Sequence, residues 1–99
     1  MSLENLPTNY QEDIKKAVSL LKNEGCRNVF LFGSMVTGKI HANSDIDIGI
    51  SGLPPKSFFR VYANLDRALA SNVDLVDFDL RKDFYAHLSS LGEVVEVGL

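Results

Sequence analysis

The sequence predicts a single α/β or α+β domain in which helices pack on one face of a mixed β-sheet. Short apolar runs at 28–32, 45–51 and 73–78 have the length and composition of strands. Amphipathic stretches with apolar residues every three or four positions alternate with them, which favours helices between the strands. With 99 residues, of which 45% are hydrophobic, the chain can form one compact core spanning 1–99.

The first half of the chain predicts a helix followed by two strands. The helix is capped by Thr8 or Asn9, ends at Gly25, and has an apolar stripe at helical spacing that consists of Tyr10, Ile14, Ala17, Val18 and Leu21. The segment 28–32 (NVFLF) is a short buried strand. In the segment 45–51 (DIDIGIS), side chains alternate between two faces, with Ile46, Ile48 and Ile50 on one and Asp45, Asp47 and Gly49 on the other.

The second half predicts a helix, a strand, a helix and an edge strand. Pro54-Pro55 break the chain, and a helix over about 57–71 turns inward its apolar residues Phe58, Val61, Tyr62, Leu65, Ala68 and Leu69. The strand 73–78 (VDLVDF) follows. Asp79 can cap a last helix striped by Leu80, Phe84, Leu88 and Leu91, and "EVVEV" after Gly92 can form the edge strand.

Charge and composition exclude several classes of function. The net charge is −3 and the ten basic residues are scattered, which disfavours nucleic-acid binding because a duplex requires several phosphates to be neutralised together. Cys26 is the one cysteine and cannot form an internal disulfide. No apolar run approaches the ~20 residues of a membrane span, and the N-terminus lacks the pattern of a signal peptide. A cytoplasmic location is expected.

Asp45 and Asp47 are the candidate metal ligands. Their Cα atoms are expected roughly 6.5 to 7 Å apart with side chains on the same face, so that both carboxylates can reach one cation cluster. Two such charges repel one another unless a cation compensates. Ligands that offer only oxygen suit Mg²⁺ or Mn²⁺.

A third carboxylate is expected from the strand 73–78. Asp74 has the opposite parity to the apolar Val73 and Leu75, so it is predicted on the same face as the first two aspartates. Asp77 is the rival, but it has the other parity and lies where aspartates commonly form turns or helix starts.

Gly33-Ser34 is the candidate phosphate site. Glycine lets the backbone approach a bulky anion, N–H groups of the following helical turn can meet phosphate oxygens, and Ser34 adds a hydroxyl donor. Three aspartates with two divalent ions leave a site near +1. A nucleoside triphosphate is the anion expected there.

The spacing of Gly33-Ser34, ten residues, Asp45 and Asp47, then Asp74, resembles the signature of the DNA polymerase beta nucleotidyltransferase superfamily. The size of the chain and the shape of its C-terminal third resemble the minimal nucleotidyltransferase (MNT) branch of this superfamily. Members of that branch are antitoxin-type partners of HEPN-domain proteins in prokaryotes. The likeness covers roughly 10–97 and implies a polymerase-beta-type core.

This resemblance implies a reaction. Asp45, Asp47 and Asp74 would hold two metal ions, with the triphosphate between them and the Gly33-Ser34 turn. AMP would pass from ATP to a hydroxyl, a tyrosine near the active site of a HEPN toxin, while Asp74 accepts its proton.

The sequence departs from the branch after Gly-Ser, where arginines are common and Met35-Val36-Thr37 stand here. Lys39 or His41 are the candidates to replace them, although His41 also fits a solvated loop and His87 a helix surface. Two further functions stay open: a weakly catalytic MNT fold that neutralises its partner by covering it, and nucleotidyl transfer to a small molecule. Homo- or hetero-oligomers are both compatible with the sequence.

Overall fold

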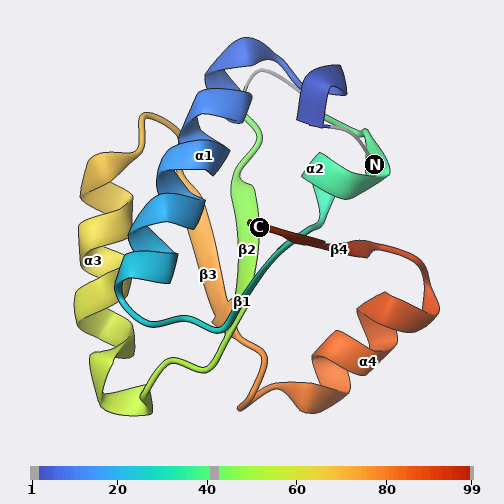
Figure 1. Ribbon diagram of the computed structural model, residues 1–99. Helices are drawn as coiled ribbons and strands as arrows, with labels where there is room; N and C mark the ends of the chain where they lie inside the picture. Colours follow the sequence, from blue (N-terminus) through green and yellow to red (C-terminus); the bar gives the residue numbers. More distant parts are fainter. Residues whose placement is uncertain (1–2, 41–42, 99) are drawn as a thin grey trace.

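The structure is a computed structural model that describes residues 3–40 and 43–98 (Figure 1). Its helices are α1 (Thr8–Asn23), α2 (Ser34–Thr37), α3 (Phe58–Ala68) and α4 (Lys82–Ser90). Its strands are β1 (Asn28–Phe32), β2 (Ile46–Ser51), β3 (Val73–Asp77) and β4 (Val94–Val97). Single 3₁₀ turns precede α1 and α3, at Leu3–Asn5 and Pro55–Ser57. The predicted order of elements is confirmed.

The four strands form one mixed sheet in the order β3-β2-β1-β4. β2 and β3 are parallel, whereas β1 is antiparallel to both β2 and β4. The parallel pair runs downward in Figure 1, so the N-terminal ends of β2 and β3 lie at the top of the sheet. β3 and β4 are the two edge strands.

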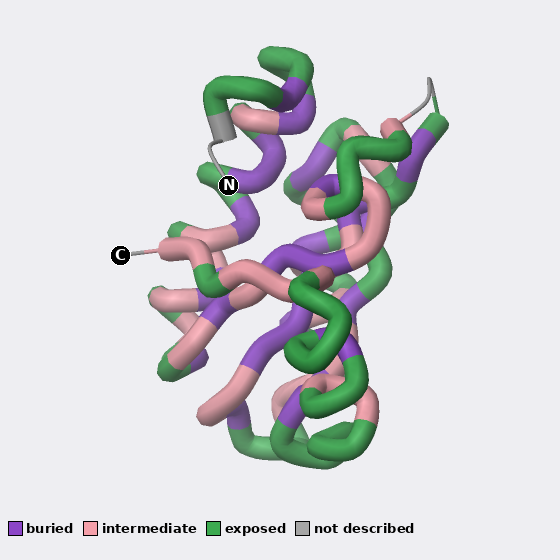
Figure 2. Tube along the Cα trace, turned by 90° about the vertical axis from the view of Figure 1, so that its right-hand side faces the viewer, coloured by how far each residue is buried: buried purple, intermediate pink, exposed green. Residues whose placement is uncertain are grey.

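α1 and α3 cover one face of the sheet, as predicted, and enclose the main core. Ile46, Ile48 and Ile50 are each at most 1% exposed, and they meet side chains of both helices that are equally buried: Ile14, Ala17, Leu21, Val61 and Leu65. Figure 2 shows the buried segments gathered in the central strands and along one side of α1. Burial of each isoleucine, leucine or valine among them contributes on the order of 1.5–3 kcal/mol to folding.

α4 packs on the other face, where the sequence predicted no helix. Phe32, Phe78 and Leu88 form a second, smaller cluster there, with Phe30 and Tyr85 at its edge. The ring of Phe78 lies so close to Gly49 that a Cβ at that position would be 2.0 Å from its Cε2 atom. The sheet is therefore covered from both sides.

The predicted N-cap of α1 is wrong. Thr8 is the first helical residue and Pro7 occupies the cap position, where its carbonyl accepts the N–H groups of Tyr10 and Gln11 at 3.0 and 3.1 Å. No side-chain cap is present. Proline is tolerated at this place because the N–H that it lacks would have no intrahelical partner. Gly25, with φ of 101°, ends the segment as predicted.

The predicted course of the last helix is wrong at both ends. Leu80 and Leu91 are 66% and 53% exposed because α4 covers only Lys82–Ser90, so both leucines fall outside its packed stripe. Asp79 does not cap α4; its carboxylate accepts the backbone N–H of Gly52 at 2.8 Å. Ala68, predicted inward on α3, is the exposed last residue of that helix.

Within the described residues, no helix is long and apolar enough to cross a membrane.

Candidate active site

The register of the sheet brings Asp47 and Asp74 together. Asp47 is the second residue of β2 and pairs with Phe32 of β1 on one side and with Asp74 of β3 on the other. Neighbouring strands are about 4.8 Å apart, and paired residues direct their side chains to the same face. Asp45, which is exposed, directly precedes β2.

Asp77 lies apart from these carboxylates. It pairs with Ile50 at the other end of β3 and is 5% exposed, whereas Asp74 is exposed. Val73 and Leu75 are buried on the side of the main core, as the parity argument required. The positions predicted for Asp74 and Asp77 are thus those found, while the chemical role of Asp74 stays a prediction.

Negative charge accumulates at the top of β2 and β3. Burial, together with the charges of Asp74 and Asp45, raises the pKa of Asp47 to about 6. The environment of Asp47 therefore disfavours its ionised form. A nearby cation would offset the repulsion between its carboxylate and those of Asp74 and Asp45. The three carboxylates consequently fit a divalent ion in donor type and in charge.

The carboxylates do not form a closed metal centre in this arrangement. Across residues 3–40 and 43–98, no group of at least three His, Cys, Asp or Glu side chains is gathered closely enough to hold a metal ion by itself. Asp45 directly precedes β2, and its charge acts on Asp47.

Gly33 places the backbone directly against Asp47. A Cβ at position 33 would lie 2.1 Å from Oδ2 of Asp47, and the glycine has φ of 70°, which side chains disfavour. Its carbonyl accepts the N–H groups of Val36 and Thr37, both at 3.0 Å, which starts α2. The Gly33-Ser34 turn is therefore part of the carboxylate site.

The residues after Ser34 anchor α2 rather than supply charge. Met35 is 1% exposed and Val36 packs against the main core. Lys39, two residues beyond the end of α2, is exposed. His41 lies outside the described residues, and His87 is exposed on α4, as predicted.

Sequence reasoning missed the polar role of Tyr62, which it assigned to the core only as an apolar residue. Its hydroxyl donates to the carbonyl of Val73 at 3.1 Å and lies 3.4 Å from Oδ1 of Asp74. Burial is the main cause that raises the pKa of Tyr62. This contact ties Asp74 to α3. No spacing rule predicts it, because it depends on how α3 packs along the free edge of β3.

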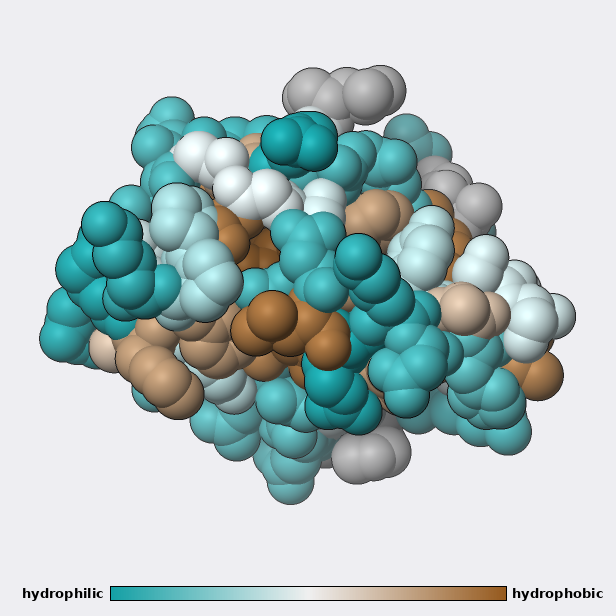
Figure 3. Space-filling view, turned by 90° about the horizontal axis from the view of Figure 1, so that it is seen from below, coloured by the Kyte–Doolittle hydropathy of each residue, from teal (hydrophilic) through white to brown (hydrophobic). Residues whose placement is uncertain are grey.

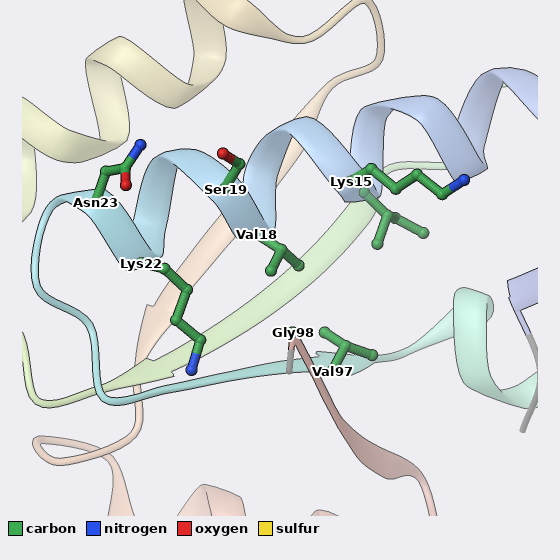
Figure 4. A pocket seen from close by; sticks show the side chains of 8 residues that line it. Lys15, Val18, Ser19, Lys22, Asn23, Val97 and Gly98 are labelled. Carbon is green, nitrogen blue, oxygen red and sulfur yellow. The ribbon is translucent and has the colours of Figure 1, made fainter.

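A groove of about 480 Å³ lies away from the carboxylates. Figure 4 shows it between α1 and the end of β4, with Val18 and Val97 facing one another and Lys22 reaching toward β1. The Lys22 ammonium donates to the carbonyl of Arg27 at 3.0 Å. The groove is lined by none of the predicted site residues.

Known proteins share the family and the fold of this chain. A family model described as Polymerase beta, Nucleotidyltransferase matches residues 12–95. No curated protein matches. Among solved structures, the chain is 29% identical to a chain of a toxin-antitoxin complex with AMP-PNP, with a TM-score of 0.63 and coverage of 94% of this chain and 75% of that one.

Two other structures are similar. A chain from a complex of tri-AMPylated Shewanella oneidensis HEPN toxin with MNT antitoxin is 30% identical, with a TM-score of 0.51 and coverage of 70% of this chain and 56% of that one. A minimal nucleotidyltransferase shares the fold at 23% identity, a TM-score of 0.64, and coverage of 96% and 95%. Because the family model extends over most of the chain, the protein belongs to the Polymerase beta nucleotidyltransferase family.

Proposed function

We propose that this protein transfers AMP from ATP to a tyrosine hydroxyl of a HEPN-type partner and thereby acts as an antitoxin. The observation that carries the proposal is the register pair Asp47 and Asp74, with Asp45 beside it and the Gly33 backbone against Asp47. A cluster of uncompensated carboxylates next to a glycine turn suits a cation and a phosphate chain together.

Each residue has a separate role in this proposal. Asp45, Asp47 and Asp74 would hold Mg²⁺ or Mn²⁺, which supplies positive charge to the phosphoryl oxygens. Gly33 and Ser34 face the phosphates with backbone and hydroxyl donors, and Lys39 is the nearby cation in the sequence. Tyr62 holds Asp74 in place through its hydroxyl.

The transfer step balances without a further reactant. The acceptor oxygen forms a bond to the α-phosphorus, and the bond from that phosphorus to the oxygen bridging it to the β-phosphorus breaks. Pyrophosphate leaves, and the proton of the acceptor hydroxyl passes to Asp74.

The choice of acceptor rests on similarity. Chains of toxin-antitoxin complexes resemble this protein, one of them with AMP-PNP and another with an AMPylated HEPN toxin. A HEPN-type acceptor is the extension of those findings to this chain. A cytoplasmic setting is proposed with it.

The test uses ATP labelled at the α-phosphate, Mg²⁺ and the candidate HEPN protein. We expect label on the partner, located on a tyrosine by mass spectrometry, and its loss with Asp45→Asn plus Asp47→Asn. Asp83→Asn is the matched control, because Asp83 is an exposed carboxylate on α4, and it should retain the label. Transfer that persists in the double variant would disprove the assignment of the site.

A second function is favoured by the apolar segment after Ser34, where Met35 is buried and supplies no charge to a phosphate. In that case the protein neutralises its partner by covering it. The same double variant separates the two functions: under occlusion it inhibits the partner as well as the wild type does, and neither protein leaves any label.

A further inference from the structure

The hydroxyl of Tyr62 lies against Asp74, the carboxylate to which the proposed function assigns the proton of the acceptor. Tyr62 belongs to α3 and packs against the main core. Asp74 alternates with the core residues Val73 and Leu75 and therefore faces the other side of the sheet. Because β3 is an edge strand, the side chain of Tyr62 reaches Asp74 around the outer edge of the sheet, beside which Figure 1 shows α3.

This contact has the donor and the base that a transfer to tyrosine requires. The Tyr62 oxygen lies 3.4 Å from Oδ1 of Asp74 and 3.1 Å from the carbonyl oxygen of Val73. In both contacts the hydroxyl donates its proton, so neither contact occupies a lone pair of the tyrosine oxygen. A general base must lie within hydrogen-bond reach of the proton that it removes, and such contacts are often long before a substrate binds. With respect to Asp74, the Tyr62 hydroxyl therefore lies where an acceptor hydroxyl is needed.

The other two tyrosines of the chain are held elsewhere. Tyr10 is 5% exposed, and its hydroxyl donates to a backbone carbonyl just before β2 at 3.2 Å. The ring of Tyr85, on α4, packs on two phenylalanine rings of the smaller cluster, with centroids 5.3 and 5.2 Å away. Tyr62 is half-buried, and its contact with Asp74 is exposed to solvent. A nucleotide can thus reach the hydroxyl of Tyr62.

We propose that the protein also transfers AMP to its own Tyr62, within one chain. This inference rests on the proposed function, because it uses the same ATP and the same carboxylates. The Tyr62 oxygen forms a bond to the α-phosphorus, the bond from that phosphorus to the oxygen bridging it to the β-phosphorus breaks, and pyrophosphate leaves. The hydroxyl proton passes to Asp74. The product is a phosphodiester that joins Tyr62 to AMP.

The position of Tyr62 favours transfer within one chain over transfer between two copies. Exposed apolar side chains, through which proteins commonly associate, lie at the other end of β3, where Phe59 and Leu80 are 82% and 66% exposed. Figure 3 shows apolar surface on this underside of the molecule, surrounded by hydrophilic residues. Two copies that met there would leave the Asp74 end of β3 outside the contact.

The test incubates the full chain alone with Mg²⁺ and ATP labelled at the α-phosphate. We expect label on the chain itself, located on Tyr62 by mass spectrometry of its peptides, and loss of that label with Tyr62→Phe. Tyr85→Phe is the matched control, because Tyr85 is also half-buried but lies on α4, and it should retain the label. Label that persists in Tyr62→Phe, or that maps to another residue, would overturn the proposal.

Dilution separates transfer within a chain from transfer between chains. The labelled fraction formed in a given time should not depend on the protein concentration. An Asp45→Asn plus Asp47→Asn chain mixed with the wild type should stay unlabelled. A labelled fraction that rises with concentration, or label on the double variant, would contradict the intramolecular step.

A second readout requires no turnover. With Mg²⁺ and α,β-methylene ATP, which cannot release pyrophosphate, the aromatic NMR signals of Tyr62 should shift saturably while those of Tyr85 stay in place. Saturation at the amides of Gly33 and Asp47 with unchanged Tyr62 signals would place the nucleotide away from Tyr62 and overturn the proposal.

The outcomes distinguish this inference from the proposed function. Label on the HEPN-type partner but none on the chain itself overturns the self-transfer and leaves the proposed function in place. Label on Tyr62 with none on the partner supports the self-transfer and removes the partner as acceptor, and no label on either protein removes both. Should Tyr62→Phe fail to fold, the position of the label in the wild type decides.

Discussion

Asp47 combines two environments that oppose each other. Its backbone belongs to the hydrogen-bonded pairing of β2 with β1 and β3, while its carboxylate is partly buried beside two other carboxylates. The pKa of about 6 lies above the ordinary value of 3.8, so the folded protein binds a proton more tightly there than the unfolded chain does. This residue therefore stabilises the fold most fully below pH 3.8, and that stability is lost as the pH rises through about 6.

Replacement of this charge should stabilise the metal-free protein. Asp47→Asn keeps the shape and removes the repulsion, so its melting temperature in EDTA should exceed that of the wild type at pH 7.5, and the difference should shrink near pH 4. Scanning calorimetry at the two pH values measures this. Asp83→Asn should show no such pattern, and an unchanged or lower melting temperature for Asp47→Asn at pH 7.5 would contradict the electrostatic account.

At the scale of elements, one buried carboxylate joins α1 to the loop between α3 and β3. Asp13, 2% exposed, accepts the N–H of Ala70 at 3.1 Å and that of Ser71 at 2.8 Å. Burial by itself would raise the pKa of Asp13, but the hydrogen bonds from Ser71 and Ala70 outweigh it and hold the value below 3.8. The contact thus stabilises the fold above that pH and is lost as the pH falls through the lowered value.

Asp13→Asn should lower the free energy of unfolding at pH 7 by roughly 1–3 kcal/mol, since the amide can accept one of the two N–H groups and leaves the other unpaired. Urea titrations at pH 7 and pH 3 should show a smaller difference at the lower pH. Glu12→Gln, at an exposed neighbour, is the control. A constant difference at both pH values would show that packing, rather than charge, accounts for the loss.

The faces of the strands could be predicted from the sequence, whereas the contacts between elements could not. The alternation of apolar and polar residues in DIDIGIS and VDLVDF predicts which side chains of β2 and β3 share a face. It therefore predicts that Asp47 and Asp74 lie close together, as the register shows. The contact of Asp13 joins α1 to a loop far along the sequence, and that of Tyr62 depends on how α3 packs beside β3, so no local pattern contains them. Leu80 fitted a helical stripe, but the turn that begins at Asp77 delays α4 to Lys82.

At the scale of the whole molecule, the sheet separates two bodies of side chains. The main core lies between the sheet, α1 and α3, and the aromatic cluster lies under α4. The candidate active site belongs to the face of α4, since Asp47 alternates with the core residues Ile46 and Ile48. A ligand bound there should contact β2 and β3 through the aspartates and the end of β1 through the turn at Gly33. Its binding should therefore stabilise the entire fold.

Mg²⁺ with a non-hydrolysable ATP analogue should raise the melting temperature of the wild type, by mass action on the folded state. At a concentration a hundred times the dissociation constant, the gain is about 2.7 kcal/mol. Each protein is compared with its own value in EDTA, because Asp47→Asn already changes the baseline. A shift of equal size in the Asp45→Asn plus Asp47→Asn variant would remove the metal hypothesis.

The two glycines near Asp47 differ in how they constrain sequence variation. At Gly33 both the φ of 70° and the contact with Asp47 oppose any side chain. No single substitution elsewhere should therefore allow a residue other than glycine at position 33. At Gly49 the φ is ordinary, and the atoms nearest to an added Cβ belong to the ring of Phe78. In a randomised library selected for folding, Gly49→Ala should therefore survive only with a smaller residue at position 78, whereas position 33 should return glycine whatever accompanies it. A second substitution can suppress the defect of a replaced glycine where a neighbouring side chain causes the clash. It cannot do so where the glycine's own backbone conformation excludes a side chain.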